Sequence, residues 1–414
     1  MIGFLRRWAD VCFRRNIKYS LPIIFLFGLV KESYRHNKLK PIEWLDENTT
    51  NLKKTFLSKT SGTSYGPLNC NGFQHIEHVQ LPSVSLYYFE NSIVSILSSS
   101  ILSNNKIIIE RLDSVDLMRC NYSAGHVFMH DKKNALVRHK QVSHLKKGFF
   151  LGGNGSSNYY HWMIEILPKL QFLHQVNQCG YADFPLLVSK DIQHIKPFCE
   201  ALNIIAKDRP VVMLDKDKTY CVEKLIYINA PNNLPFNLRQ NEKMRIADFL
   251  TRPESINFLK NQLCTILDSP PITNLYHRIF FARNNERRDY NQQEIFEIFK
   301  KQGFQKVFME ELSLKDQILL ISNAEIIAGP TGAAWTNIIF CREGTKCLCW
   351  MAEGHGEFSA FSNLAKVVGA EMYYTTFKTD AKSPMELYYQ NYTVDAKKIK
   401  QSLDTLLALS AKNH

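Results

Sequence analysis

Three groups of residues in this chain of 414 residues have types and spacings that could do chemistry. The first is a glycine turn, Gly329-Pro330-Thr331-Gly332-Ala333, between two apolar runs. A turn at the carboxyl end of a parallel strand presents backbone N–H groups at a helix N-terminus, where hydrogen bonds and the helix dipole stabilise a phosphate. The alternative is a tight strand-to-helix turn without a ligand, because short glycine patterns are weak signals.

The second group is a set of three arginines, Arg283, Arg287 and Arg288, which follow the apolar run 277–282. That run is typical of a strand. Because the carboxyl ends of parallel strands meet at one edge of a sheet, we expect these side chains near the glycine turn. Guanidinium groups can bind a diphosphate bidentately and stabilise it as a leaving group. The alternative is a solvated basic loop, and the neighbouring turn favours the phosphate site.

The third group is a histidine and an acid at helical spacing. A loop rich in Gly, Asn and Ser leads to Ser157 or Asn158 as the cap of an amphipathic helix, which Pro168 should kink. His161 lies in its first turn, and Glu165 lies four residues later on the same face. A histidine oriented by an acid can take the proton from an attacking hydroxyl. The competing interpretation is a buried, hydrogen-bonded histidine without a catalytic role.

Two further patterns concern metal ions. Asp215 and Asp217 form a D-x-D pair at the end of an apolar run, where it could bind a divalent metal and a sugar-nucleotide diphosphate, although Asp is also an ordinary turn residue. Cys347 and Cys349 would point to one face of a strand, so burial is favoured over metal binding. The ten cysteines have irregular spacing, so we expect no disulfide framework and a reducing compartment.

These groups are positioned by an α/β pattern. Short β-like runs separated by polar turns extend from about residue 67 to 150, and apolar runs then alternate with helical segments. We predict a basic tail at 1–48, an N-terminal acceptor-side α/β domain with a β-rich start at 49–250, a C-terminal Rossmann-like donor-binding domain at 251–375, and a C-terminal helix packing back at 376–414.

The net charge of +12 is concentrated at the N-terminus, where residues 1–40 contain nine Lys/Arg and two acidic residues. A basic tail on a nearly balanced body indicates an anionic membrane surface as a partner and no nucleic acid. The apolar run 21–30 is too short to span a membrane, and no signal-peptide cleavage site follows it. We therefore expect peripheral attachment to the cytoplasmic face of the inner membrane, with a helix docked on the body as the alternative.

Four segments together carry a family resemblance. They are Asn158 to Leu170, the block Phe281-Ala282-Arg283 with Arg287, Arg288 and Asn291, Leu312 to Gln317, and Ile327 to Asn337. In this combination and order the chain resembles family 61 glycosyltransferases, in the branch found in bacterial capsule and surface-polysaccharide clusters. The resemblance runs from about residue 148 to 394 and leaves residues 1–66 outside.

The resemblance implies an inverting, metal-independent glycosyltransferase with two Rossmann-like domains facing a cleft, an arrangement called GT-B. The donor would be a nucleotide sugar, commonly a UDP sugar, and the acceptor a growing polysaccharide or a glycolipid; no cofactor is implied. Position by position, the donor-binding residues would be Arg283, Arg287, Arg288, Thr331, Gly332, Ala333 and Asn337, and the catalytic residues His161 and Glu165. Many members of the family have His where this chain has Thr331, so a hydroxyl would replace an imidazole here.

Two rival functions follow from the same residues. A non-catalytic, membrane-docked subunit that binds nucleotide sugars or glycans would need no His161–Glu165 pair. A Rossmann dehydrogenase is disfavoured, because no G-x-G-x-x-G follows an early strand.

Overall fold

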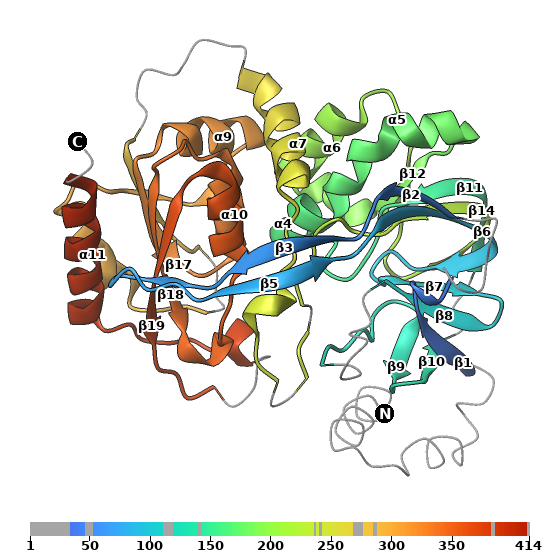
Figure 1. The fold of residues 1–414 in the computed structure, drawn as a ribbon, viewed down its shortest axis with the longest axis horizontal. Helices are drawn as coiled ribbons and strands as arrows, with labels where there is room; N and C mark the ends of the chain where they lie inside the picture. The colour runs from blue at the N-terminus through green and yellow to red at the C-terminus, as the bar shows by residue number, and fades with distance from the viewer. Residues whose placement is uncertain are drawn as a thin grey trace.

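The computed structural model describes residues 34–45, 53–110, 119–138, 142–235, 237–239, 242–267, 276–284, 288–381 and 386–411. This part of the chain is α/β, with an eleven-stranded sheet, a six-stranded sheet and a separate two-stranded hairpin. Figure 1 shows the six-stranded sheet with its helices on the left and the eleven-stranded sheet on the right.

The eleven-stranded sheet joins the β-rich start to an α/β unit. Its strands are β1 (Tyr34–Pro41), β2 (Lys53–Leu57), β6 (Val84–Val94), β7 (Ser100–Ser103), β8 (Lys106–Ile109), β9 (Val127–His130), β10 (Asn134–Arg138), β11 (Val142–Phe150), β12 (Leu186–Ser189), β13 (Val211–Leu214) and β14 (Thr219–Ile228). β11 pairs in parallel with β12 and β14, whereas β14 pairs antiparallel with β6. The two parts therefore form one continuous sheet.

The helices of this half are short and interrupted. They are α4 (Tyr159–His161), the π turn η1 (Trp162–Ile166), the 3₁₀ turn η2 (Leu167–Phe172), α5 (Leu173–Val176), η3 (Asn177–Tyr181), η4 (Lys190–His194), α6 (Lys196–Ala206), η5 (Ile246–Asp248), α7 (Pro253–Cys264) and η6 (Thr265–Leu267). The predicted single helix with a kink is thus a series of turns. Pro168 stands at the start of η2, where its missing N–H breaks the helical ladder.

The six-stranded sheet is parallel throughout. Its strands are β15 (Arg278–Phe281), β16 (Gln305–Val307), β17 (Ile326–Pro330), β18 (Lys346–Ala352), β19 (Glu371–Phe377) and the short β4 (Leu68–Asn69), in the order β16-β15-β17-β18-β19-β4. Its helices are α8 (Gln292–Lys300), η7 (Met309–Glu311), α9 (Leu314–Asn323), η8 (Ala333–Phe340), η9 (Glu353–His355), α10 (Ala360–Val368), η10 (Glu386–Tyr388) and α11 (Ala396–Ala411).

Alternating side chains of these strands pack on two faces. Ile279 and Phe281 of β15 belong to the core cluster with α9, η8 and α10, whereas Phe280 belongs to the cluster with α8 and α11. After the early edge strand β4, the chain returns to the sheet at β15, adds β16 on one side and then continues with β17 on the other. In such doubly wound sheets ligands bind outside the carboxyl ends of the strands at the point of reversal. Here that point lies between β15 and β17.

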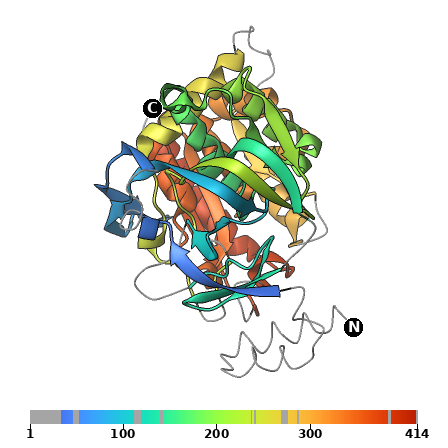
Figure 2. The same cartoon turned by 90° about the vertical axis from the view of Figure 1, so that its right-hand side faces the viewer.

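A hairpin from the N-terminal region crosses to the six-stranded sheet. β3 (Thr60–Tyr65) pairs with β5 (Ile76–Leu81), and Figure 1 shows this hairpin, in blue, extending away from the eleven-stranded sheet, a direction that runs along the line of sight in Figure 2. Asn363 of α10 accepts from Tyr65 N at 3.0 Å, and β4, between the two hairpin strands, pairs with β19. One core cluster includes residues of both large sheets. The two halves are therefore joined by strands and by a shared core.

The predicted tail overlaps the folded body. Residues 34–41 form β1, between β8 and β10, and Leu39, Ile42 and Leu45 are buried. The structure therefore places residues 34–45, which the predicted tail over 1–48 includes, in the folded body, because β1 pairs with β8 and β10 and Leu39, Ile42 and Leu45 are buried. Residues 1–33 and 46–48 lie outside the described residues. Within the described chain, no helix has the length and apolar character needed to cross a membrane.

Candidate functional site

The loop after β15 and the loop after β17 meet at the carboxyl edge of the six-stranded sheet. An Nη group of Arg283 donates a hydrogen bond to the carbonyl oxygen of Thr331. A Cβ added at Gly332 would lie 2.9 Å from the same guanidinium. Since the φ of Gly332 is 172°, an extended value open to any residue, its backbone conformation does not require glycine, and the missing side chain leaves room for the Arg283 guanidinium.

The backbone of Arg283 is held by the first residue of α8. Gln292 accepts from Arg283 N at 2.8 Å and donates to Arg283 O at 3.1 Å. This pair of bonds fixes the direction in which the side chain leaves the strand. Nothing in the sequence pattern had singled out Gln292.

Arg288 is buried in an unfavourable state. It is 8% exposed, its φ is +57°, and no acidic residue forms an ion pair with it or with Arg283 in the described part of the chain. Burial and the neighbouring charge of Arg283 lower the pKa of Arg288 to about 10. The Nε atoms of both arginines lack hydrogen-bond partners. Two neighbouring guanidinium groups that have no acidic partner among the described residues can bind an anion. Arg287 lies outside the described residues.

The residues that follow Gly332 turn into η8. Thr331 is buried and donates its N–H to Trp350 O at 2.8 Å, and Trp335 N donates to Gly332 O at 3.1 Å. η8, which starts at Ala333, is a 3₁₀ helix, whereas an α-helix is the usual partner of a parallel strand. The first N–H groups of any helix lack partners within it.

Asn337 lies deeper than expected. It is 1% exposed, accepts from the Tyr159 hydroxyl at 2.9 Å and donates to Ala334 O at 3.1 Å. The predicted role of Asn337 in donor binding stays a prediction. What the structure places there is a contact between η8 and α4.

His161 and Glu165 form a buried, hydrogen-bonded pair at the start of the interrupted helix. Asn158 caps α4 by accepting from Tyr160 N at 2.9 Å. His161 Nδ1 bonds to one oxygen of Glu165, and the other oxygen accepts from Leu234 N at 2.7 Å. A carboxylate on Nδ1 fixes the tautomer in which Nε2 is the basic nitrogen. The pairing expected from the helical spacing is therefore present.

The His161–Glu165 pair and the Gly332 turn lie on elements that contact each other. Tyr159, two residues before His161, bonds to Asn337, five residues after Gly332. Tyr160 also packs edge-on against Phe361 of α10, with ring centroids 6.1 Å apart. The His161–Glu165 pair therefore lies on an element that adjoins the one following Gly332. We call the edge formed by Arg283, Arg288 and the Gly332 turn the rim.

The D-x-D pair lies elsewhere. Asp215 and Asp217 follow β13, the edge strand of the eleven-stranded sheet, and Asp215 caps its own turn by accepting from Asp217 N at 3.2 Å. Asp215 also pairs with Lys218 at 3.9 Å. Among the described residues no group of three or more His, Cys, Asp or Glu side chains could hold a metal ion. The pair behaves as an ordinary turn in this structure.

Comparison with known proteins agrees with the resemblance. Residues 159–348 match the family model described as Glycosyltransferase 61. No curated protein matches the chain. Among solved structures, a diflavin flavoprotein A3 from Nostoc sp. shares 11% identity over 34% of this chain and 96% of that one, with a TM-score of 0.24, too low to support any inference. Residues 159–348 are therefore similar to family 61 glycosyltransferases, and this similarity implies glycosyl transfer.

Proposed function

We propose that the protein is a family 61 glycosyltransferase that moves a sugar from a UDP sugar to a growing capsular or surface polysaccharide or its glycolipid precursor. The observation that supports the donor class is the rim where Arg283, Arg288 and the Gly332 turn converge. Its two cations have no acidic partner in the described chain, and a diphosphate would supply one. Positive side chains and a glycine turn at the carboxyl ends of parallel strands are a recurrent phosphate site.

On the donor side, the two guanidinium groups neutralise the diphosphate and stabilise it as it departs. This is electrostatic stabilisation of the charge that develops in the transition state. Because the arginines supply the positive charge, the reaction needs no divalent metal. The side chain of Thr331 occupies the position where many members of the family carry histidine.

On the acceptor side, His161 is the general base. Its Nε2 takes the proton of the acceptor hydroxyl while the acceptor oxygen bonds to the anomeric carbon and the bond from that carbon to the diphosphate breaks. The sugar is transferred with inversion, because attack and departure occur on opposite faces in one step. Glu165 orients the imidazole and stabilises its protonated form.

The enzyme works, in this proposal, on the cytoplasmic face of the inner membrane, where the basic residues 1–33 meet anionic lipid. A glycolipid acceptor would lie in the membrane, so attachment there would bring enzyme and acceptor together.

The test is nucleoside diphosphate release from a panel of nucleotide sugars, with and without a polysaccharide acceptor. Acceptor-dependent release of UDP by the wild type, lost in Arg283→Met, supports the proposal. Binding of UDP sugars without any release over all acceptors would instead indicate a non-catalytic binding subunit. Release that is unchanged in Arg283→Met would remove this rim from the mechanism.

A further inference from the structure

A third loop contributes a buried imidazole to the same edge of the sheet. β18 lies beside β17, with Trp350 opposite Pro330 in the register, and η9 begins directly after β18. His355 ends η9 and is 6% exposed. The loops after β15, β17 and β18 therefore all lie at the carboxyl edge of the six-stranded sheet. His355 belongs to the loop after β18.

The imidazole of His355 is in a costly state in the free protein. Its Nε2 is buried without a hydrogen-bond partner, which leaves the desolvation of that nitrogen uncompensated. Burial, Arg288 and Arg283 together lower the pKa of His355 to about 3, so the ring is neutral at physiological pH. Its ring otherwise contacts Phe358, with centroids 6.0 Å apart, and Tyr388, at 5.8 Å. A neutral imidazole has one N–H donor, and Nε2 has no hydrogen-bond partner in the protein.

We propose that His355 is a third ligand of the donor diphosphate, donating a hydrogen bond from Nε2 to a phosphate oxygen between Arg283 and Arg288. The inference rests on the proposed function, since it assumes that a diphosphate occupies the rim. An anion there satisfies the unpartnered nitrogen and compensates both guanidinium groups at once. A hydrogen bond to a charged acceptor is stronger than one between neutral groups, so the nitrogen would gain most from this class of ligand.

The backbone around His355 is fixed by the N-terminal half of the molecule. Gly356 has a φ of +66°, and a Cβ there would lie 2.9 Å from the carbonyl oxygen of Met244. Glu357 N donates to that same oxygen at 3.2 Å. The segment around Met244 therefore forms one wall of the loop that carries His355.

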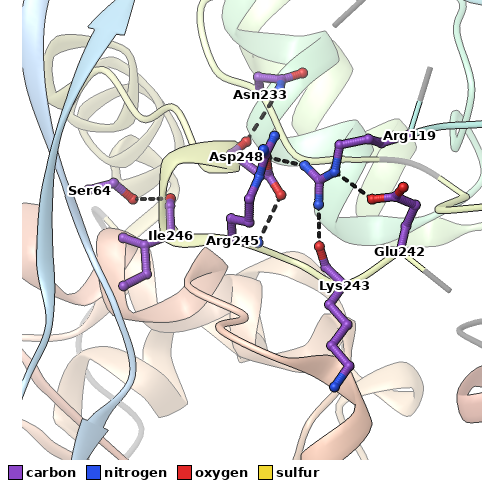
Figure 3. Close-up of polar contacts among 8 residues, drawn as sticks. All are labelled: Ser64, Arg119, Asn233, Glu242, Lys243, Arg245, Ile246 and Asp248. Carbon is purple, nitrogen blue, oxygen red and sulfur yellow. Dashed lines mark hydrogen bonds and ion pairs between the residues drawn. The ribbon is translucent and has the colours of Figure 1, made fainter. Parts of the chain in front are cut away.

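That segment is itself clamped, as Figure 3 shows. Arg119, 7% exposed, donates to Glu242 at 2.8 Å, to Asp248 at 2.5 Å and to the carbonyl oxygen of Lys243. From the other side the Ser64 hydroxyl of the crossing hairpin donates to Ile246 O at 2.7 Å. The hydrogen bonds around Met244 thus restrict the backbone that carries His355, and this restriction lowers the entropic cost of ligand binding.

The test uses two replacements of His355 and one control. His355→Leu keeps an apolar side chain of similar size and removes the N–H, whereas His355→Gln keeps an N–H donor. His277→Leu removes an exposed imidazole from the opposite end of β15, where it pairs with Glu325 at 3.4 Å. UDP affinity is measured by calorimetry, and the unfolding midpoint of each ligand-free variant by thermal denaturation.

A ligand role and a structural role predict opposite results. If His355 binds the diphosphate, His355→Leu weakens UDP binding roughly tenfold or more, because bonds to charged groups are the stronger ones, while its ligand-free midpoint is unchanged or higher. His355→Gln retains part of the affinity, and His277→Leu retains all of it. UDP affinity equal to that of the wild type in both His355 variants would overturn the inference and leave the proposed function standing. A wild type that binds no nucleoside diphosphate would overturn both.

Discussion

Replacing Arg288 by Met should stabilise the free protein and destroy its affinity for nucleoside diphosphates. Burial and Arg283 lower the pKa of Arg288 to about 10, well below the ordinary range of a guanidinium group. Because the pKa is lower in the folded protein than in the unfolded chain, the penalty is fully present below the folded pKa and disappears only above the unfolded one. At neutral pH the folded protein therefore carries all of it.

The size of the effect follows from the same shift. One pKa unit corresponds to ~1.4 kcal/mol, so the cost of keeping Arg288 charged is of the order of 3 kcal/mol. Met retains most of the aliphatic stem and removes the charge, but the positive φ at position 288 remains. We expect the free energy of unfolding of Arg288→Met to rise by about 1 to 3 kcal/mol.

The assay is urea denaturation with and without UDP. UDP at a hundredfold excess over its Kd should stabilise the wild type by about 2.7 kcal/mol and leave Arg288→Met unchanged. Arg278→Met is the control, since Arg278 begins β15, at the end opposite to the loop that carries Arg288, and donates to Gln302 O at 2.7 Å. It should respond to UDP like the wild type. A variant Arg288→Met that is less stable than the wild type and still stabilised by UDP would refute the reasoning.

Further predictions concern the turn, the acid–base pair and the metal question. Gly332→Ala places a Cβ 2.9 Å from the Arg283 guanidinium and should weaken UDP binding by about tenfold, with little change in the unfolding midpoint. Calorimetry measures the affinity and thermal denaturation the midpoint. An unaltered affinity for UDP would contradict a role for this contact in binding. Glu165→Gln should lower kcat by about 10² or more with KM for the donor preserved, and an unchanged kcat in steady-state assays would exclude the pair from proton transfer. Chelation by EDTA, and the variant Asp217→Asn, should leave the transfer rate unchanged; a rate lost in EDTA and restored by Mn²⁺ would return the D-x-D pair to the mechanism.

The meeting of Arg283 with the glycine turn could be predicted because it depends on local rules. Short apolar runs followed by glycine or charged residues mark the carboxyl ends of buried parallel strands, and such ends share an edge. The His161–Glu165 bond followed in the same way, since residues four apart in a helix lie on one face.

Other features depend on contacts that no local pattern encodes. β4 joins the six-stranded sheet more than 300 residues away from its partner β19, and residues 34–45 entered the body through pairing with β8 and β10. His355 was missed because a single histidine in a loop has no spacing to mark it. Its one signal was position, just beyond the strand next to the glycine turn.

Arg288 shows a different limit. The sequence placed it with the basic loop, but neither its burial nor its positive φ could be derived from the residue types. Burial with no acidic partner among the described residues favours an anion site over a solvated basic loop, and this observation needed the packing of the surrounding elements.

The most direct test is the crystal structure of the protein with UDP bound. The account predicts a diphosphate at the carboxyl edge between β15 and β17, with its oxygens within hydrogen-bond distance of Arg283, Arg288 and the Gly332 turn. A diphosphate bound elsewhere on the molecule, with these two arginines still unpaired, would contradict it.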